Sequence, residues 1–466
     1  MPQDIATLEN GTTQESGLRH QLSAGQMAMV AVGGSIGTGL LLGSAAAIEI
    51  AGPAVIISYA LAGFIAWTVT MALGELSSAH PGAGSFGLYA DLYLNPWAGF
   101  VSRTGYWIAI SVSVGANLVA SATYMRYWFP TVPALVWTAV FSLVLIVINL
   151  RPVGDYGRFE YWFAMVKLVT IAIFIVIGGM LLMGGRVPVQ YTSHGGFFPR
   201  GAVAPLLAMT FALYTFGGIE IVAITTGESR TTAEIPRAVK LTFATLAVVY
   251  LGAIVVLVGV MPWNRAWVTE SPFVTVFRAV GIPAATSLMS FVILTAALSG
   301  ANANLYSASR MLFSLARGGW ASAALGRLNA AGSPKLALIA SSYGIAVAVI
   351  LQTWAAKNAF VYILTGALFG LMLSWLVSLA AHISFRKRMS STQVTALPMR
   401  SPLGALGSIL GLTLVSAAIL KTWWDSRVSL LSGVSTLLIL TAAYMLLRSG
   451  KGTMRKTQSV PRAMDT

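Results

Sequence analysis

The sequence contains no cysteine and very few charged residues. None of its 466 residues is cysteine, and only 9% are Asp, Glu, Lys or Arg. Without cysteine the chain forms no disulfide and offers no thiolate as a nucleophile or metal ligand. Charged residues make up about a quarter of an ordinary soluble domain, so the shortage of charge excludes that class of protein.

Uncharged windows of membrane length fill the sequence instead. A helix needs about 20 apolar residues to cross the hydrocarbon core of a bilayer, and many windows reach or approach that length. Apolar and polar residues do not alternate along them, which argues against a membrane-spanning barrel. We predict an all-α integral membrane protein with about 12 transmembrane helices. The expected spans lie near residues 23–48, 51–76, 97–124, 133–150, 159–183, 202–227, 238–261, 283–316, 335–354, 358–384, 403–421 and 428–448.

Acidic residues are scarcer than basic ones, with 14 Asp and Glu against 29 Lys and Arg and a net charge of +15. The basic residues fall mainly in alternate loops between the expected spans. This positive-inside pattern predicts that both termini lie in the cytoplasm. The excess positive charge is then explained by the orientation of the protein and by contact with anionic lipid, so we expect no nucleic-acid partner.

Glycine interrupts the first expected span. The stretch VGGSIGTGLLLG, residues 32–43, holds five glycines, and each costs a helix about 1 kcal/mol relative to alanine. The spacing of Gly33 and Gly37 is also typical of close helix packing in lipid. A second interrupted stretch, LYTFGGIEIVAITTGE, lies in the span near 202–227 and places a glutamate soon after paired glycines. The pair of stretches favours deliberate breaks over simple packing.

Two interrupted spans, each opening a set of five helices, predict a five-plus-five inverted repeat with unwound helices 1 and 6. Helices 11 and 12 would stand outside the repeat, and no soluble domain is expected between the spans. The expected regions are a cytoplasmic tail over 1–20, the repeat core of helices 1–10 over 21–384, a basic cytoplasmic loop over 385–402, helices 11 and 12 over 403–448, and a cytoplasmic tail over 449–466.

The unwound backbone predicts the kind of ligand. Peptide groups that lipid cannot satisfy persist only around a polar cavity. A half-helix that begins near Thr38 and Gly39 directs N–H groups and a positive dipole end at that cavity, which suits a carboxylate. A half-helix that ends near Thr215 and Phe216 offers carbonyl oxygens, which suit an ammonium. The site is therefore expected to take a zwitterion. An α-amino acid is the simplest, and γ-amino acids and betaines stay open.

Ionisable residues at membrane depth are functional candidates. Lys167 lies about eight residues into the fifth span, or about 12 Å along a helix. It either extends toward the cytoplasm as an anchor or exchanges a proton during transport, and its depth favours proton coupling. Glu220 either holds the second unwound segment by accepting hydrogen bonds or joins a proton relay. Asn117 is expected to form an interhelical hydrogen bond.

Features of an enzyme are missing. The four histidines are dispersed and show no HExxH spacing, and the spans contain no GxSxG motif and no acidic metal cluster. We therefore predict no catalytic residue, no metal and no cofactor.

Several motifs resemble the amino acid permeases of the amino acid–polyamine–organocation superfamily, and specifically its bacterial amino acid transporter branch. The similar stretches are GGSIGTGLLLGS, MALGELSSAHPGAGSFGLYADLYLNPWAGF, EYWFAMVKLVTI, FGGIEIVAITTGE and LSGANANLYSASRMLFSLAR. They run from about Leu22 to past Arg317. The resemblance implies the fold of the leucine transporter.

The resemblance also implies roles for individual residues. It places Ser35, Ile36, Gly37, Thr38 and Gly39 around the substrate carboxylate, and Tyr214, Thr215, Phe216 and Gly217 at the amino group, with Phe216 also a candidate gate. Lys167 resembles the amine that takes the place of a sodium ion in proton-coupled relatives. Asn117 stands where many relatives have a glutamate, which disfavours a dibasic substrate. Independently of the resemblance, we expect Ser299, Asn302 and Ser307 in the span near 283–316 to be polar residues of the lining, and Asn117 to be a further substrate-binding residue.

The sequence therefore predicts a secondary active transporter of the bacterial cytoplasmic membrane that imports neutral amino acids with protons by alternating access. An exchanger that swaps one amino acid for another, or for an amine, stays open. An amino acid sensor that does not transport and an integral-membrane enzyme are the more distant alternatives.

Overall fold

The computed structural model describes residues 17–37, 39–265, 273, 276–277, 285–354, 359–425 and 427–458. The regular structure of these residues is helical, apart from one isolated bridge between Leu22 and Ser229. Nine helices in the described part are long and apolar enough to cross a membrane, and Ala134–Asn149 and Lys335–Ile350 form shorter apolar helices. The all-α membrane fold is thus confirmed, while the number of twelve spans and the repeat stay predictions.

The described helices follow one another along the chain with short connections. The first half contains α2 (Ala24–Ser35), η1 (Gly39–Gly43), α3 (Ser44–Ala51), α4 (Val55–Ala79), α5 (Ser85–Tyr93), α6 (Pro96–Met125), α7 (Ala134–Asn149) and α8 (Val153–Met183). The second half contains α9 (Ala204–Phe216), α10 (Ile221–Thr225), η3 (Thr226–Glu228), α11 (Ile235–Val260), α13 (Ala285–Arg317), α14 (Lys335–Ser341), α15 (Tyr343–Trp354), α16 (Ala359–Arg388), α17 (Ser391–Thr395), α18 (Gly404–Asp425) and α19 (Arg427–Gln458).

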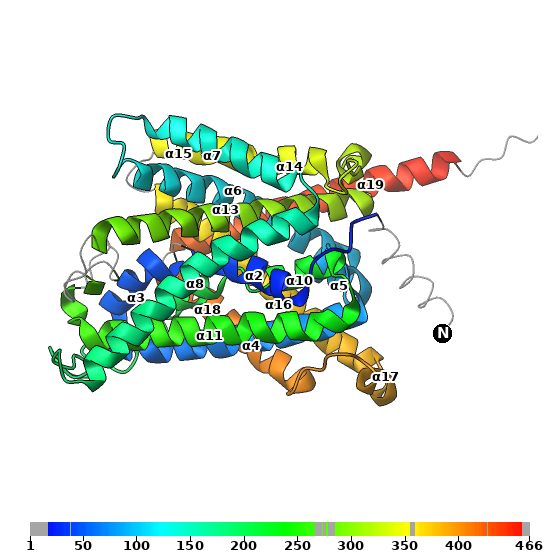
Figure 1. The fold of residues 1–466 in the computed structure, drawn as a ribbon. Coiled ribbons are helices and arrows are strands. Elements are labelled where there is room, and N and C mark those ends of the chain that lie inside the picture. The colour runs from blue at the N-terminus through cyan, green and yellow to red at the C-terminus, as the bar shows by residue number, and fades with distance from the viewer. Residues whose placement is uncertain are drawn as a thin grey trace, which may run out of the picture.

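The axes of most long helices are nearly aligned with one another, and α8 crosses them obliquely beside α2 (Figure 1). The short helices α2, α3 and α10 lie in the middle of this bundle. Helix α2 packs against α8, α10, α11 and α13, while α9 packs against α3 and α4. Helix α6 joins the two halves because it packs against α13, α15 and α16. The interrupted segments therefore lie at the centre of the protein.

The ends of several helices follow from local sequence. Ser23 caps α2 in a capping box with Gln26, which satisfies backbone N–H groups of the first turn. Gly52, at φ +61°, turns the chain between α3 and α4, and Pro53 occupies the next position. Helix α8 begins directly after Pro152, a residue that favours the start of a helix over its interior.

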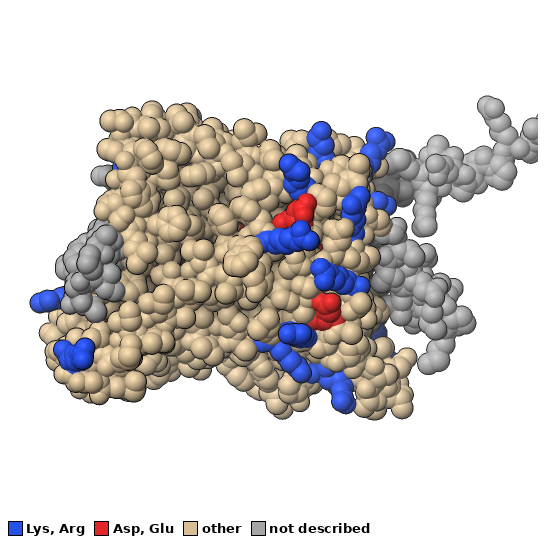
Figure 2. All heavy atoms as spheres, in the orientation of Figure 1, with Lys and Arg blue, Asp and Glu red and all other residues tan. Residues whose placement is uncertain are grey.

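Lysine and arginine side chains gather at one end of the molecule (Figure 2). This is the end at which α5, α17 and the last turns of α19 lie (Figure 1). The middle of the face shown in Figure 2 carries almost no charge, as expected of a surface that contacts lipid. We call the end of the molecule that gathers the lysine and arginine side chains the basic end.

Both predicted interruptions are present. Helix α2 ends at Ser35, the chain bends at Ile36 and Gly37, and helical structure resumes at Gly39 with the π-helical turn η1. Helix α9 ends at Phe216, and α10 begins at Ile221 after four intervening residues. Each interrupted helix is therefore two half-helices whose ends meet at the centre of the bundle.

Candidate functional site

The two interruptions touch each other. Gly218 has φ +99°, and a Cβ atom there would lie 2.8 Å from the backbone nitrogen and the hydroxyl oxygen of Ser35. A Cβ at Gly39 would lie 3.2 Å from the Cα of Thr215. Glycine is needed at Gly218 both for its positive φ and for this close approach of two backbones.

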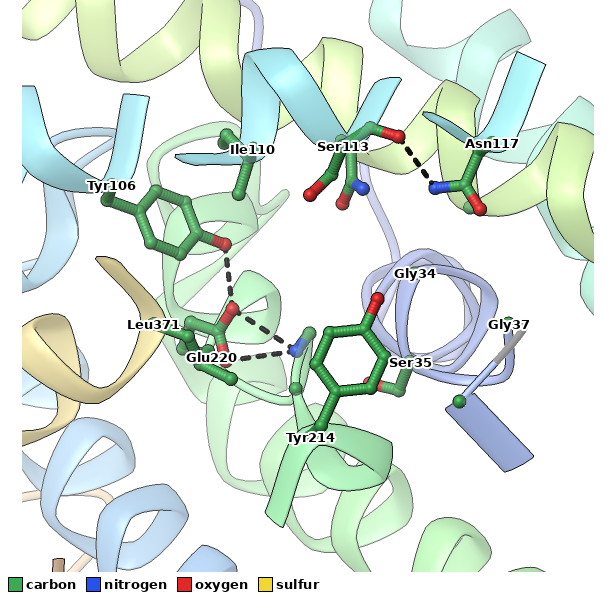
Figure 3. A pocket seen from close by; sticks show the side chains of 15 residues that line it. Gly34, Ser35, Gly37, Tyr106, Ile110, Ser113, Asn117, Tyr214, Glu220 and Leu371 are labelled. Carbon is green, nitrogen blue, oxygen red and sulfur yellow. Dashed lines mark hydrogen bonds between the residues drawn. The ribbon is translucent and has the colours of Figure 1, made fainter. Parts of the chain in front are cut away.

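A cavity of about 70 Å³ lies where the two breaks meet (Figure 3). It is several times larger than the ~10–15 Å³ that one water molecule requires, so it has room for a small solute. Its lining comes from the two interrupted helices and from α6, α13 and α16: Gly34, Ser35, Gly37, Gly39, Tyr106, Ile110, Ser113, Asn117, Tyr214, Gly217, Gly218, Glu220, Gly300, Asn304 and Leu371. Glycines of both breaks are in this lining, which exposes peptide groups to the cavity.

Glu220 holds the second break in place. Its carboxylate accepts hydrogen bonds from the backbone N–H of Gly218 at 3.1 and 3.2 Å, from the hydroxyl of Tyr106 at 2.7 Å and from the indole of Trp375 at 3.1 Å. The side chain is buried. The carboxylate therefore ties the unwound backbone to α6 and α16, and it is the one charged group among the described residues that line the cavity.

Lys167 lies beside the first break. Its side chain is buried, and Nζ donates to the carbonyl of Gly33 at 2.6 Å, the carbonyl of Ile36 at 2.8 Å and the hydroxyl of Ser299 at 3.0 Å. The last carbonyls of a helix have no partner within the helix. Lys167 therefore supplies donors to carbonyls that the end of α2 leaves unpaired.

A second ionisable residue near the first break was not predicted. Glu160 is fully buried on α8, seven residues before Lys167. Its carboxylate accepts hydrogen bonds from the hydroxyl of Ser299 and, at 2.6 Å, from the amide of Asn302. Residues seven apart share one face of a helix, so the EYWFAMVK stretch contained the signal that would have found Glu160.

The predicted residues divide into those that line the cavity and those beside it. The lining includes Ser35, Gly37, Gly39, Asn117, Tyr214, Gly217 and Glu220. Ser299 and Asn302 instead face Lys167 and Glu160, away from the lining. Thr38 lies outside the described residues.

The remaining predicted residues near the breaks act through their backbones or their packing. The side chain of Ile36 is fully buried, and its carbonyl faces Lys167. The Thr215 hydroxyl lies 3.2 Å from that of Tyr59. Phe216, the candidate gate, is fully buried and packs edge-on against Tyr250 at a centroid distance of 4.9 Å, so it does not line the cavity.

Helices α6 and α13 form the wall opposite the breaks (Figure 3). Ser113 and Asn117 lie one turn apart on α6, and the Asn117 amide donates to the Ser113 carbonyl at 3.0 Å. Asn304 from α13 and the aliphatic Ile110 complete this part of the lining. None of these four side chains is charged, so the wall offers amides, a hydroxyl and apolar surface.

A membrane-spanning helical protein whose two interrupted helices border a cavity for a small solute has the organisation of a secondary transporter. The amino acid permease family model matches residues 26–458, and the chain belongs to this family. The family lies within the amino acid–polyamine–organocation superfamily, as the sequence motifs predict.

Relatives cover nearly the whole chain. It is 34% identical over 449 residues to the "Gamma-aminobutyric acid permease" of Bacillus subtilis (strain 168), covering 94% of this chain and 95% of the relative. It is 35% identical over 422 residues to the "Aromatic amino acid transport protein AroP" of Escherichia coli (strain K12), covering 89% and 92%. It is 33% identical over 446 residues to the "Probable threonine/serine transporter YbxG" of Bacillus subtilis (strain 168), covering 94% and 96%. These bacterial permeases support amino acid transport by a multi-pass inner-membrane protein.

Proposed function

We propose that this protein imports neutral amino acids across the cytoplasmic membrane by proton symport with alternating access. The observation that carries the proposal is the contact between the two breaks, which brings exposed peptide groups of both to one cavity. Peptide N–H groups at one half-helix suit a carboxylate, and carbonyls at the other suit an ammonium. A zwitterion satisfies both.

The proposal that the substrate side chain is neutral depends on the cavity wall formed by α6 and α13, opposite the two breaks. Its residues carry no charge that would pair with a basic or acidic side chain. The names of the three relatives refer to γ-aminobutyric acid, aromatic amino acids and threonine or serine. All of these are zwitterions without net charge, and we extend that class to this chain.

Orientation follows from the basic end of the molecule. Cytoplasmic loops of membrane proteins carry the excess of Lys and Arg, so we place the end that gathers these residues, and both termini, in the cytoplasm (Figure 2). On this side Arg310 pairs with Glu228 at 2.9 Å, and Leu22 forms an isolated bridge with Ser229. These contacts close the cytoplasmic side and must open when substrate is released inward.

Proton coupling is assigned to Lys167. A buried ammonium is costly in a membrane, and here it holds the end of α2 through two carbonyls. Loss of its proton removes the positive charge, which weakens both of these hydrogen bonds and allows α2 to move. Protonation and opening are thereby linked.

Uptake into proteoliposomes tests the proposal. An imposed gradient of protons, with the interior alkaline, should drive accumulation of a neutral amino acid, while a sodium gradient should not. A thermal-shift screen against the twenty amino acids identifies the substrate beforehand, because a ligand that binds the folded state raises its stability. Lys167→Ala should abolish accumulation more strongly than equilibrium exchange. Accumulation driven by sodium alone, or uptake only with internal substrate, would overturn proton symport.

A further inference from the structure

A buried polar cluster lies beside the cavity, between α8, α13 and α7. At its centre is the Glu160 carboxylate, which accepts hydrogen bonds from the Ser299 hydroxyl and from the Asn302 amide at 2.6 Å. The side-chain oxygen of Asn302 accepts in turn from the side-chain amide of Asn149 at 2.7 Å. Burying a carboxylate in a membrane protein is costly, and Glu160 is not among the described residues that line the cavity.

One hydroxyl connects this carboxylate with the lysine at the first break. Ser299 Oγ accepts from Lys167 Nζ at 3.0 Å and donates to Glu160. A Cβ atom at Gly33 would collide with the same carboxylate and hydroxyl. The carboxylate therefore lies directly against the last turn of α2, the turn whose Gly33 carbonyl Lys167 holds.

We infer that Glu160 is the group to which Lys167 passes its proton, with Ser299 as the bridge; the inference rests on the proton symport proposed above. An N–H bond of the ammonium breaks as an O–H bond forms on Ser299. The original O–H bond of Ser299 breaks as an O–H bond forms on Glu160. The products are a neutral amine and a neutral carboxylic acid, so the net charge of the cluster does not change.

The transfer releases α2 without moving a charge through lipid. The hydrogen that leaves is the one directed at Ser299, so the neutral amine keeps one hydrogen for each of the Gly33 and Ile36 carbonyls. These two hydrogen bonds weaken because they are no longer assisted by a positive charge. After the transfer the carboxylic acid donates to the Ser299 oxygen and still accepts from the Asn302 amide through its other oxygen. Coupling between protonation and movement of the half-helix follows from this change in hydrogen bonding.

Further ionisable side chains lie around Glu160. Tyr156 lies one turn earlier on α8, its buried hydroxyl has no hydrogen-bond partner among the described residues, and its ring stacks on that of Tyr306 at 4.6 Å. Tyr306 donates to Glu228. The other titratable or charged groups that face this region come from α8, α13 and η3: Lys167, Tyr156, Tyr306, Arg310 and Glu228. Helix α7 contributes the neutral Asn149, and α2 contributes no titratable side chain.

The experiment compares coupled and uncoupled transport in proteoliposomes. Glu160→Gln keeps the size of the side chain and resembles the neutral acid, with one acceptor oxygen and one donor group, but it cannot take up a proton. Glu160→Asp remains titratable. Glu49→Gln, at an exposed carboxylate on α3, is the matched control. Counterflow at equal pH reports binding and reorientation, and a pH-sensitive dye inside the vesicles reports proton movement.

We expect Glu160→Gln to retain counterflow within about threefold and to lose proton-driven accumulation and dye response by at least about tenfold. Glu160→Asp should restore part of both, and its pH profile of uptake should differ from that of the unchanged protein. Glu49→Gln should behave as the unchanged protein does. If Glu160→Gln does not fold, Ser299→Ala interrupts the same bridge and Ser299→Thr retains it.

Two results overturn the inference. One is proton-coupled accumulation by Glu160→Gln at the level of the unchanged protein. The other is an equal fall of counterflow and accumulation that Glu160→Asp does not relieve, which would mean that Glu160 only supports the structure. If the unchanged protein itself shows no proton-driven accumulation, the proposed function fails first, so the two failures are distinguishable.

Discussion

Replacing Gly218 by alanine tests whether the contact between the two breaks creates the site. The added methyl group would lie 2.8 Å from the nitrogen and hydroxyl oxygen of Ser35 and 2.9 Å from the carbonyl carbon of Gly34. Two of these three atoms belong to backbone, which cannot rotate away as a flexible side chain can. The half-helices must separate or the backbone of the second break must change its path.

The cost of Gly218→Ala has two parts. Holding alanine at φ +99° costs about 1–3 kcal/mol, as for other residues in sparsely populated backbone regions. Forcing additional atoms into a packed interior costs about 1–3 kcal/mol more. The sum, about 2–6 kcal/mol, corresponds to at least about a 30-fold loss of the conformation that binds substrate. We expect transport to fall by at least that factor.

Two other glycines separate these contributions. Gly185 has φ +62° but open space around an added Cβ, so Gly185→Ala measures backbone strain alone. Gly179 lies within α8 with open space and no positive φ, and alanine there should be neutral or slightly stabilising. Thermal unfolding in detergent measures stability, and counterflow in proteoliposomes measures the site. Transport by Gly218→Ala at the rate of Gly179→Ala would refute the contact between the breaks.

Two further substitutions test the cavity wall. Glu220→Gln replaces one acceptor oxygen by a donor and leaves a buried donor of Gly218, Tyr106 or the Trp375 indole without a partner, which costs about 1–3 kcal/mol. We expect a lower unfolding temperature and weaker substrate binding in a thermal-shift titration. Unchanged values of both would contradict the role of Glu220 in holding the second break. Asn304→Leu removes an amide from the wall, so uptake of amino acids with hydrogen-bonding side chains should fall by about tenfold relative to aliphatic ones. Competition assays measure this ratio, and an equal loss for all amino acids would contradict a side-chain subsite on α13.

The two helix breaks could be predicted because their cause is local. Glycine is costly in a helix, and clusters of it within apolar stretches leave few explanations other than close packing or a break. The structure places the breaks at Ile36–Gly37 and at Gly217–Glu220, within the glycine-rich stretches themselves. Backbone propensity and the absence of water in lipid act on each segment separately, so one sequence is sufficient to apply them.

The rotation of each helix about its own axis, which decides the side chains that face the cavity, could not be predicted in the same way. Successive residues on a helix are rotated by about 100° from each other, so a small error in facing changes which side chains meet the cavity. Ser299 was expected in the lining, whereas its neighbour Gly300 lines it and Ser299 faces Glu160. Only the packing of α13 against α6, α8 and α2 decides that rotation. Tyr106, one turn before Ile110 on α6, was missed for the same reason.

The charges at the two breaks are matched to the peptide groups that each break leaves unpaired. The end of α2 exposes carbonyls, and the cation Lys167 donates to two of them. The turn after α9 exposes an N–H group, and the anion Glu220 accepts from it at Gly218. Because an unpaired peptide group is expensive in a dry interior, each charge stabilises an unwound segment that lipid would otherwise forbid. A change in the charge of Lys167 must therefore alter the stability of the first break. In the proposed proton symport, this is the physical link between the proton and the position of a half-helix that borders the cavity.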